Sequence, residues 1–166
     1  MGTLDGTPLG HIWVAVNEVG LVAVDLWGDR GRFEQQVEAL TGCVPVLGDD
    51  RVTAVTTQLD EYLQKQRTLF TVPIDWSVMT PFQQTVLQAV AAVEYGRLQT
   101  YADIAQTIGK PKAVRAVGRA NATNPMPIII PCHRILGSNG KLHGYSAPGG
   151  LETKAWLLRL EGSWLL

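Results

Sequence analysis

The spacing of the apolar residues changes at Thr80-Pro81, and this change divides the chain into two parts that must fold differently. Before it, runs rich in β-branched and aromatic residues alternate with helical patterns, which indicates a small α+β domain. After it, short helical patterns follow one another. We therefore expect two domains, residues 1–80 and 81–166. A chain of 166 residues can bury a core without disulfides or a metal ion.

In the first part, residues 11–16 and 21–27 are predicted strands of a hairpin, because a Gly-containing loop separates two runs of β-forming residues. Helices are predicted over 32–40 and 51–66, where apolar residues recur every three to four positions. Residues 69–74 are predicted to return to a strand.

The second part opens on a strong helix-start signal. Thr80 is a predicted N-cap, Pro81 suits the first helical position, and Gln83 is predicted to complete a capping box with Thr80. The helix that follows is expected over 82–93.

Two further helices, 101–108 and 112–122, are predicted on either side of Gly109-Lys110-Pro111. Short helices joined by a tight turn are typical of a helix-turn-helix. Residues 124–134 contain three prolines and are expected to be extended rather than helical. A last helix is predicted over 153–160.

The two parts carry opposite charge, although the formal net charge of the chain is only −1. Residues 1–80 hold five basic and 11 acidic side chains, net −6, and residues 81–166 hold nine basic and four acidic ones, net +5. This asymmetry is expected when a basic part meets an anionic partner, and it also arises by drift of two solvated surfaces. The near-neutral total therefore does not exclude nucleic acid as a partner.

Composition and missing motifs exclude several other classes. The chain is 46% apolar and has two cysteines, so it is neither disordered nor a disulfide scaffold. It has no run of 18 apolar residues and no signal-peptide pattern, and we expect a cytoplasmic protein with no membrane partner. Because no CxxC, HxxxH or phosphate-binding glycine motif is present, no metal site or cofactor is expected.

The two cysteines differ in their surroundings. Cys43 lies in a turn with no basic residue beside it in sequence, which favours a structural or incidental thiol. Cys132 follows an apolar run and a proline and precedes His133 and Arg134, so a neighbouring imidazole is available to accept its proton. The alternative for Cys132 is a buried core cysteine beside a surface His-Arg pair.

The predicted helix 112–122 combines three cations with small residues. Arg115 and Arg119 are four residues apart and share a face, and Gly118 costs about 1 kcal/mol relative to alanine in a helix. In a DNA-binding protein this is a groove-entering helix with phosphate contacts. The alternative is a solvent-facing helix whose small residues pack tightly on a neighbour.

Residues 124–135 read Asn-Pro-Met-Pro-Ile-Ile-Ile-Pro-Cys-His-Arg-Ile, and Gly144-Tyr-Ser146 and Glu161-Gly162 follow. These motifs closely resemble the O6-alkylguanine-DNA alkyltransferase family, also called methylated-DNA–protein-cysteine methyltransferases. The resemblance covers 81–166 almost without gaps and covers the first part less specifically. It implies an α+β fold, with a ribonuclease-H-like α/β domain at 1–80 followed by a mostly helical winged helix-turn-helix domain at 81–166.

The family resemblance implies stoichiometric DNA repair. An alkyl group passes from O6-alkylguanine, and from O4-alkylthymine, to a protein cysteine without any cofactor. The partner would be double-stranded DNA, bound by a monomer through the minor groove with the damaged base flipped out. Some relatives hold a structural zinc with Cys and His near the N-terminus; the matching cluster is absent here, so no zinc is expected.

The resemblance also assigns residues to roles. One set holds, deprotonates and orients the nucleophile: Cys132, His133, Glu161, Asn124 and Tyr101. A second set lies on or beside the predicted recognition helix and contacts DNA: Arg115, Ala113, Ala116, Gly118, Arg119, Lys112 and Thr100. A third set surrounds the flipped base: Tyr145, Ser146, Ile135 and Pro127.

Within these sets the resemblance makes Cys132 the nucleophile and His133 a general base that acts through a water and is oriented by Glu161. Arg115 fills the space vacated by the flipped base, and Tyr101 helps to rotate the nucleotide. Two other classes of function remain as alternatives. One is a winged-helix protein that binds DNA or damage without chemistry, and the other is a Cys-His hydrolase that turns over.

Overall fold

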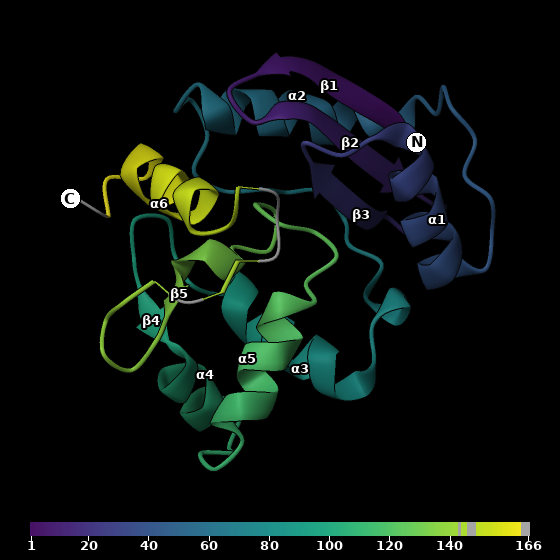
Figure 1. Cartoon of the computed structure of the whole chain (residues 1–166). Helices are drawn as coiled ribbons and strands as arrows, with labels where there is room; N and C mark the ends of the chain where they lie inside the picture. The colour runs from purple at the N-terminus through teal and green to yellow at the C-terminus, as the bar shows by residue number, and fades with distance from the viewer. Residues whose placement is uncertain (143, 146–148, 164–166) are drawn as a thin grey trace. The chain divides into compact units, whose positions relative to one another are not determined.

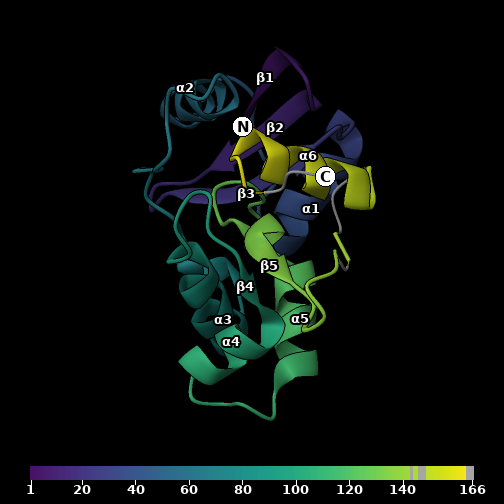
Figure 2. The same cartoon turned by 90° about the vertical axis from the view of Figure 1, so that its left-hand side faces the viewer.

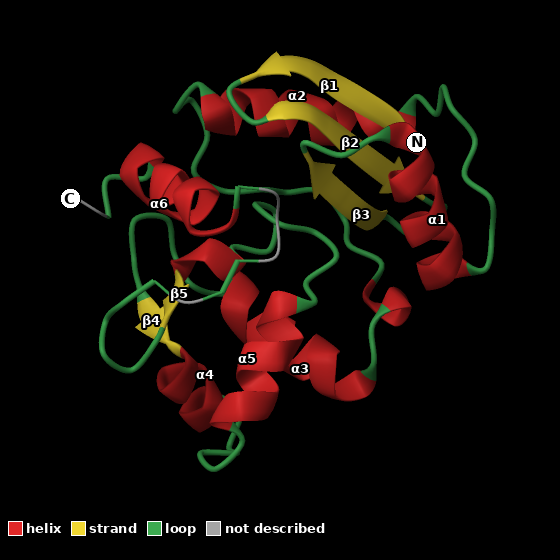
Figure 3. Ribbon diagram, in the orientation of Figure 1, coloured by secondary structure: helices red, strands yellow, loops and turns green. Residues whose placement is uncertain are grey.

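The computed structural model describes residues 1–142, 144–145 and 149–163, and the chain forms two compact units, Met1–Met79 and Thr80–Leu166. Figure 1 follows the chain by colour from one end to the other, and Figure 3 separates helices from strands.

The first unit is built on a three-stranded antiparallel sheet in the order β1 (Gly2–Thr7), β2 (Gly10–Val16), β3 (Leu21–Leu26). The predicted hairpin is confirmed, with Ile12 opposite Leu26 and Val14 opposite Val24. β1 was not predicted, because its sequence GTLDGT mixes glycine and polar residues. Its pairing with β2 compensates for this low strand propensity.

Two helices pack on this sheet. Helix α1 (Arg30–Thr41) contacts β2 and β3, and helix α2 (Arg51–Leu63) contacts β1 and β2. All six residues of β3 are buried, which requires cover on both faces of the sheet. Both helices were predicted, with ends that differ from the observed ones by at most three residues.

The predicted strand over 69–74 is wrong. The segment is irregular, and only one bridge joins it to the sheet, between Ile74 and Leu21. Leu21 donates to the carbonyl of Pro73 and accepts from Asp75. Proline has no N–H with which to extend a strand ladder, so its apolar neighbours pack without forming one. A 3₁₀ turn, η1 (Trp76–Val78), ends the unit.

The second unit contains three helices that contact one another: α3 (Pro81–Ala91), α4 (Tyr101–Thr107) and α5 (Val114–Ala122). They lie together in Figures 1 and 2. α4 and α5, joined by a short turn in which Gly109 has a φ of 70°, form the predicted helix-turn-helix. α5 begins two residues later than expected, so Lys112 precedes it and Ala113 is its N-cap.

The predicted capping box at the start of α3 is wrong in its second half. Thr80 accepts from the backbone N–H of Gln83. The Gln83 amide instead donates to the carbonyl and hydroxyl oxygens of Thr123 at 2.9 and 3.0 Å. A complete capping box forms at α4, where Thr100 and Asp103 bond reciprocally.

Residues 124–131 are not helical, as predicted, but the expected extended backbone is wrong: the segment bends, and the N–H of Ile130 donates to the carbonyl of Met126 at 2.9 Å. Cys132–Arg134 is a 3₁₀ turn, η2, and not extended backbone. It leads into β5 (Ile135–Leu136), which pairs in parallel with β4 (Gln99–Thr100). The last helix, α6 (Gly150–Leu160), begins three residues before its predicted start and packs on η2.

Among the described residues, no helix has both the length and the apolar character needed to cross a membrane.

Candidate functional site

The loop before Cys132 is fixed by the side chain of Asn124. Its carbonyl oxygen accepts from the N–H of Met126 at 3.0 Å, and its amide donates to the carbonyl of Ile130 at 2.9 Å. Ile128 within the loop has a φ of 72°, which is strained for a β-branched residue. Asn124 thus closes a rigid loop that ends at the thiol, and Pro127 is buried within it.

The thiol of Cys132 is almost completely buried, with 4% of the residue exposed. Its N–H donates to the carbonyl of Ile130 at 2.8 Å, and its carbonyl accepts from the Asn121 amide at 3.3 Å. Burial raises the pKa of the thiol, while Asn124 and Lys154 oppose this rise. The thiol therefore needs a base before it can act as a nucleophile.

A histidine with a carboxylate partner follows immediately in the chain. The Nε2 atom of His133 lies 2.8 Å from Oε1 of Glu161, and both side chains are wholly buried. Burial lowers the pKa of His133, and Glu161 opposes that shift. The imidazole is therefore neutral at physiological pH, which is the form that a general base requires.

Arg134 holds Glu161 in place. Its Nε and one terminal nitrogen donate to the Glu161 carboxylate, with distances of 2.9 Å to each carboxylate oxygen. Its other terminal nitrogen donates to the carbonyl of Val93, and the N–H of Gly96 donates to Glu161 at 3.3 Å. A paired guanidinium keeps a buried carboxylate ionised and oriented toward His133.

Lys154 is a second buried cation near the thiol. It lies on α6, is completely buried, and donates from Nζ to the carbonyl of Ile135. Burial lowers its pKa to about 8, and the charge of Cys132 opposes that fall. A carbonyl oxygen has two lone pairs, so Ile135 keeps acceptor capacity for a further ligand.

Two tyrosines lie near the sulfur. Burial raises the pKa of Tyr101. A hydrogen bond with the side chain of Asn121 opposes this rise, and the charge of Cys132 adds to it. Burial also raises the pKa of Tyr145 far above its usual value, and its hydroxyl has no hydrogen-bond partner among the described residues. The predicted site residue Ser146 lies outside the described residues.

The predicted DNA-binding residues gather around α5. Lys112, Arg115, Ala116 and Arg119 are exposed, whereas Ala113 and Gly118 are partly buried. The hydroxyl of Thr100 is engaged by Asp103 in the capping box, at 2.7 and 3.1 Å. α5 therefore presents cations and small residues together on its open side.

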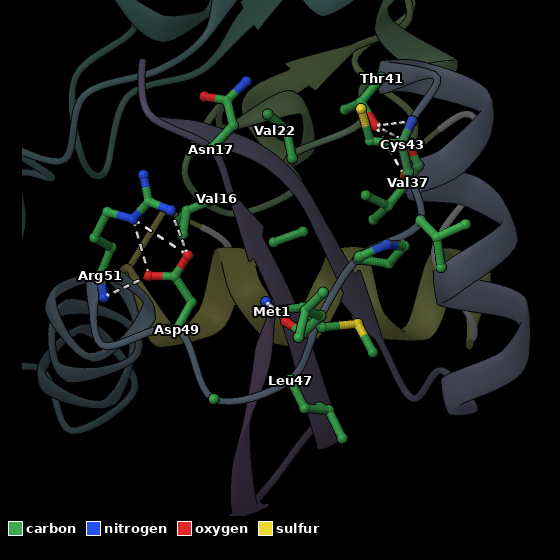
Figure 4. A pocket seen from close by; sticks show the side chains of 15 residues that line it. Met1, Val16, Asn17, Val22, Val37, Thr41, Cys43, Leu47, Asp49 and Arg51 are labelled. Atoms are coloured by element: carbon green, nitrogen blue, oxygen red, sulfur yellow. Dashed lines mark hydrogen bonds and ion pairs between the residues drawn. The ribbon is translucent and has the colours of Figure 1, made fainter.

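Cys43 lies in a different setting. It is exposed, and it borders a cavity of about 550 Å³ whose lining comes entirely from the first unit (Figure 4). The guanidinium of Arg51 at this cavity is paired with Asp49 at 2.6 Å. No histidine lines this cavity. Within the described part of the chain, no cluster of three His, Cys, Asp or Glu residues could hold a metal ion.

Three residues of this site were not predicted from the sequence. Arg134 stood in the recognised motif but was given no role, and Lys154 reads as an ordinary surface lysine of an amphipathic helix. Asn121 looked like part of the groove-facing helix, yet it is buried against Cys132. An apolar residue follows each cation, Ile135 after Arg134 and Ala155 after Lys154, and this was the available signal, because buried cations need a specific partner.

Family models match nearly the whole chain. Residues 81–163 match the DNA-binding domain of 6-O-methylguanine DNA methyltransferase, and residues 3–76 match its ribonuclease-like domain. The constitutive methylated-DNA–protein-cysteine methyltransferase of Bacillus subtilis is 41% identical over 159 residues, covering 93% of this chain and 91% of that protein. A protein of the same name from Methanosarcina acetivorans is 39% identical, with 95% of each chain covered.

Solved structures are similar over the same span. The crystal structure of Mycobacterium tuberculosis OGT in complex with DNA has a TM-score of 0.80 and 36% identity, covering 98% of this chain and 92% of that one. The structure of O6-methylguanine-DNA methyltransferase from Pyrococcus kodakaraensis has a TM-score of 0.66 and 26% identity, covering 96% of each chain.

Proposed function

The chain belongs to the 6-O-methylguanine DNA methyltransferase family, and from this premise we propose that Cys132 is its alkyl acceptor. The protein is a methylated-DNA–protein-cysteine methyltransferase that binds DNA and repairs it by direct reversal. A DNA binder without chemistry is not favoured, because the matched relatives are named for the transfer itself.

The reaction is a displacement at an alkyl carbon. The thiolate of Cys132 attacks the carbon attached to O6 of guanine, a sulfur–carbon bond forms, and the carbon–O6 bond breaks. The electron pair of that bond passes to the base, which takes up a proton. A thioether has no easy leaving group, so each molecule reacts once. The chemistry needs a thiolate, in-line placement and a proton source, and we assign no cofactor to it.

The proton of Cys132 leaves through His133. Glu161 engages Nε2 of the imidazole, so proton exchange with the thiol, through a water, would use Nδ1. The imidazolium formed in this way is stabilised by the buried carboxylate of Glu161, which Arg134 keeps ionised. Because burial raises the pKa of the Cys132 thiol, the thiol needs such a base to become a thiolate.

DNA enters by the side of α5. We assign Arg115 to the space left by a base flipped out from the minor groove, and Arg119 and Lys112 to phosphates. Ala113, Ala116 and Gly118 would allow close approach, and Thr100 would lie at the edge of the interface. Flipping is required, because the O6 substituent of a stacked base cannot reach a buried sulfur.

The flipped base would meet a small set of residues. Tyr101 would help to rotate the nucleotide, Tyr145 and Ser146 would close over the base, and the backbone of Ile135 would contact it beside Pro127. Asn124 fixes the loop that carries Cys132. We place the protein in the cytoplasm as a monomer, with O6-alkylguanine as its main substrate and O4-alkylthymine as a second one.

One observation carries this proposal: within a chain of this family, a buried cysteine precedes a histidine whose imidazole meets a buried carboxylate at 2.8 Å. The test is intact-mass analysis after incubation with duplex DNA that contains O6-methylguanine. We expect a gain of one methyl group per protein molecule, mapped to Cys132, and an unchanged gain in Cys43→Ser.

The two alternative functions predict different results in this experiment. A protein that only binds DNA would retain the duplex without a gain in mass, and a hydrolase would process substrate beyond one equivalent. A methyl gain that persists in Cys132→Ala would overturn the assignment of the acceptor.

A further inference from the structure

The side chain of Asn121 carries a buried polar atom that the fold alone does not explain. Asn121 lies near the end of α5, and only 3% of the residue is exposed. Its side-chain oxygen, Oδ1, is buried and has no hydrogen-bond partner among the described residues. An unpaired buried acceptor destabilises a protein, and a leucine of similar size would fill this position without that cost.

The amide nitrogen of Asn121 is already engaged. It donates to the carbonyl of Cys132 at 3.3 Å, and this atom must be the nitrogen because a carbonyl oxygen can only accept. The hydrogen bond between Asn121 and Tyr101 opposes the rise in the pKa of the phenol, so it stabilises the phenolate and the phenol oxygen accepts. The two hydrogens of the amide are thereby used. The group left over is Oδ1, an acceptor that can pair only with a donor.

This acceptor belongs to the site of the proposed alkyl transfer. Asn121 contacts the backbone of Cys132 and the side chain of Tyr101, which we placed at the nucleophile and at the flipped nucleotide. The hydroxyl of Tyr145, which also lies near the thiol, is a second buried polar group without a partner in the described structure. A carbonyl oxygen accepts and a hydroxyl can donate, yet these two do not bond to each other. A ligand that pairs with both must offer a donor and an acceptor.

O6-alkylguanine in DNA offers this combination on one edge. Alkylation at O6 removes the hydrogen from N1, and N9 carries the sugar. N1 and O6 are then acceptors, and the 2-amino group is the one remaining N–H donor of the base. This group lies on the same edge as O6, two ring positions away, so placing the alkyl carbon at the sulfur of Cys132 also brings the amino group into the site.

We propose that Asn121 is a specificity-determining residue of the alkyl-transfer site, whose Oδ1 atom accepts a hydrogen bond from the 2-amino group of the flipped O6-alkylguanine. This inference rests on the proposed function, because it states how the same site recognises its base. The attack keeps the balance of atoms and electrons given above, and Asn121 transfers no atom or proton in it.

The proposal ranks the alkylated bases by their chemistry. O6-methylhypoxanthine has the same alkyl group and ring but no 2-amino group, so it would leave Oδ1 of Asn121 unpaired. O4-methylthymine has no N–H on its pairing edge and would leave this oxygen unpaired as well. A buried acceptor that has lost its water disfavours every ligand that lacks the matching donor. O6-alkylguanine is therefore expected to react fastest of the three.

The test compares two substrates and several side chains in the full chain. Single-turnover rates of methyl uptake are measured with short single-stranded oligonucleotides that contain O6-methylguanine or O6-methylhypoxanthine, because no base pair has to open in them. Asn121→Leu removes Oδ1 at similar volume, and Asn121→Asp keeps an acceptor at this position. Gln88→Leu, which removes an exposed amide from α3, is the matched control.

We expect the parent to react about tenfold faster with O6-methylguanine than with O6-methylhypoxanthine, the effect of one hydrogen bond. Asn121→Leu should react with both at nearly the same rate. Asn121→Asp and Gln88→Leu should retain the preference of the parent. A purely structural role of Asn121 would instead lower both rates by the same factor and leave their ratio unchanged.

Three results would overturn the inference. They are a parent that reacts equally with both bases, an Asn121→Leu variant that keeps the ratio of the parent, and an Asn121→Asp variant that folds but loses the preference. If Asn121→Leu does not fold, Asn121→Ala takes its place under the same criterion. The proposed function fails separately: it is contradicted if the parent gains no methyl group at Cys132 from O6-methylguanine, whereas equal gains at equal rates from both bases contradict only the role of Asn121.

Discussion

At the scale of single residues, Glu161 connects the proposed base, His133, to the surrounding structure. Its carboxylate accepts from His133 and Arg134, in contacts that are buried, and from the N–H of Gly96, in a contact that is partly buried. The same contacts that orient the imidazole therefore also hold the end of α6 and the 93–97 turn. Activity and stability are coupled through one side chain, and substitutions there should reveal both.

We predict that Glu161→Gln lowers the rate of methyl uptake and destabilises the protein by about 3 kcal/mol. The rate falls because the imidazolium of His133 loses its counter-charge. The free energy of unfolding falls because Arg134 is left buried without a carboxylate. Urea denaturation and single-turnover kinetics measure the two effects.

The double variant Glu161→Leu with Arg134→Met serves as the control. It removes both charges, so it should recover part of the lost stability without recovering the rate. Equal stability of Glu161→Gln and the parent would contradict the structural part of this account, and an equal rate would contradict the catalytic part.

Asp25 allows a test of electrostatics away from the site. It lies in β3, and burial raises its pKa above the usual value; Oδ2 has no hydrogen-bond partner in the described structure. Because the folded state resists ionisation of this group, its contribution to stability is greatest below pH 4 and is lost as the pH rises through the folded pKa.

We therefore predict that Asp25→Asn stabilises the protein at pH 7, by on the order of 1 kcal/mol, with the gain vanishing toward pH 3. Chemical denaturation at a series of pH values measures it. Glu38→Gln, at an exposed position of α1, is the matched control and should show no such dependence. A stability difference that is the same at every pH would refute the electrostatic explanation.

At the scale of elements, the sequence identified those parts whose stability is local. α1, α2 and α4 carry their own periodicity or caps, and the hairpin carries its turn, in which Asn17 accepts from the backbone of Val19 and Gly20. By contrast, β1 forms only through its pairing with the neighbouring strand β2, and the two-residue strands β4 and β5 pair although they are distant in the chain. The strand propensities of their own residues do not predict these pairings.

α5 raises a specific question at Gly118. A Cβ atom built there would meet only Tyr101, at 3.9 Å, which is ordinary contact, and the φ angle needs no glycine. Nothing described within the chain therefore requires glycine in this helix. A close approach of DNA to α5, as proposed above, would supply such a requirement.

We predict that Gly118→Ala stabilises the fold by up to about 1 kcal/mol while weakening DNA binding. Thermal unfolding and a fluorescence titration with duplex DNA measure the two effects. Gly31→Ala, in the exposed first turn of α1, is the matched control and should stabilise the protein without changing affinity. Unchanged affinity of Gly118→Ala would show that DNA does not approach this face.

At the scale of the whole molecule, the sequence predicted the proposed nucleophile and base but not the buried cations around them. Cys132, His133 and Glu161 follow from a recognisable motif. The burial of Arg134 and Lys154 could not be predicted, because it depends on how α6 packs on η2. A sequence does not show whether a lysine or an arginine is buried, so the fold is needed to distinguish a buried cation from a surface one.

The difference in charge between the two parts of the chain leads to a prediction about the salt dependence of DNA binding. The net charge of +5 belongs to residues 81–166, and two of those cations, Arg134 and Lys154, are buried and unavailable to phosphates. We therefore expect the DNA-facing charge to come from a few exposed residues such as Lys112, Arg115 and Arg119. We predict a modest dependence of DNA affinity on salt, with a slope set by only a few phosphate contacts.

Substitutions in α5 should change that slope selectively. Arg119→Ala should reduce it by about one, the value for one lost phosphate contact. Arg115→Ala should weaken repair of duplex DNA more than reaction with free O6-benzylguanine, because the free base needs no flipping. Glu18→Gln, an exposed position in the acidic part, is the control for net charge and should leave the slope unchanged. If it shifts the slope as much as Arg119→Ala does, total charge and not the face of α5 governs binding.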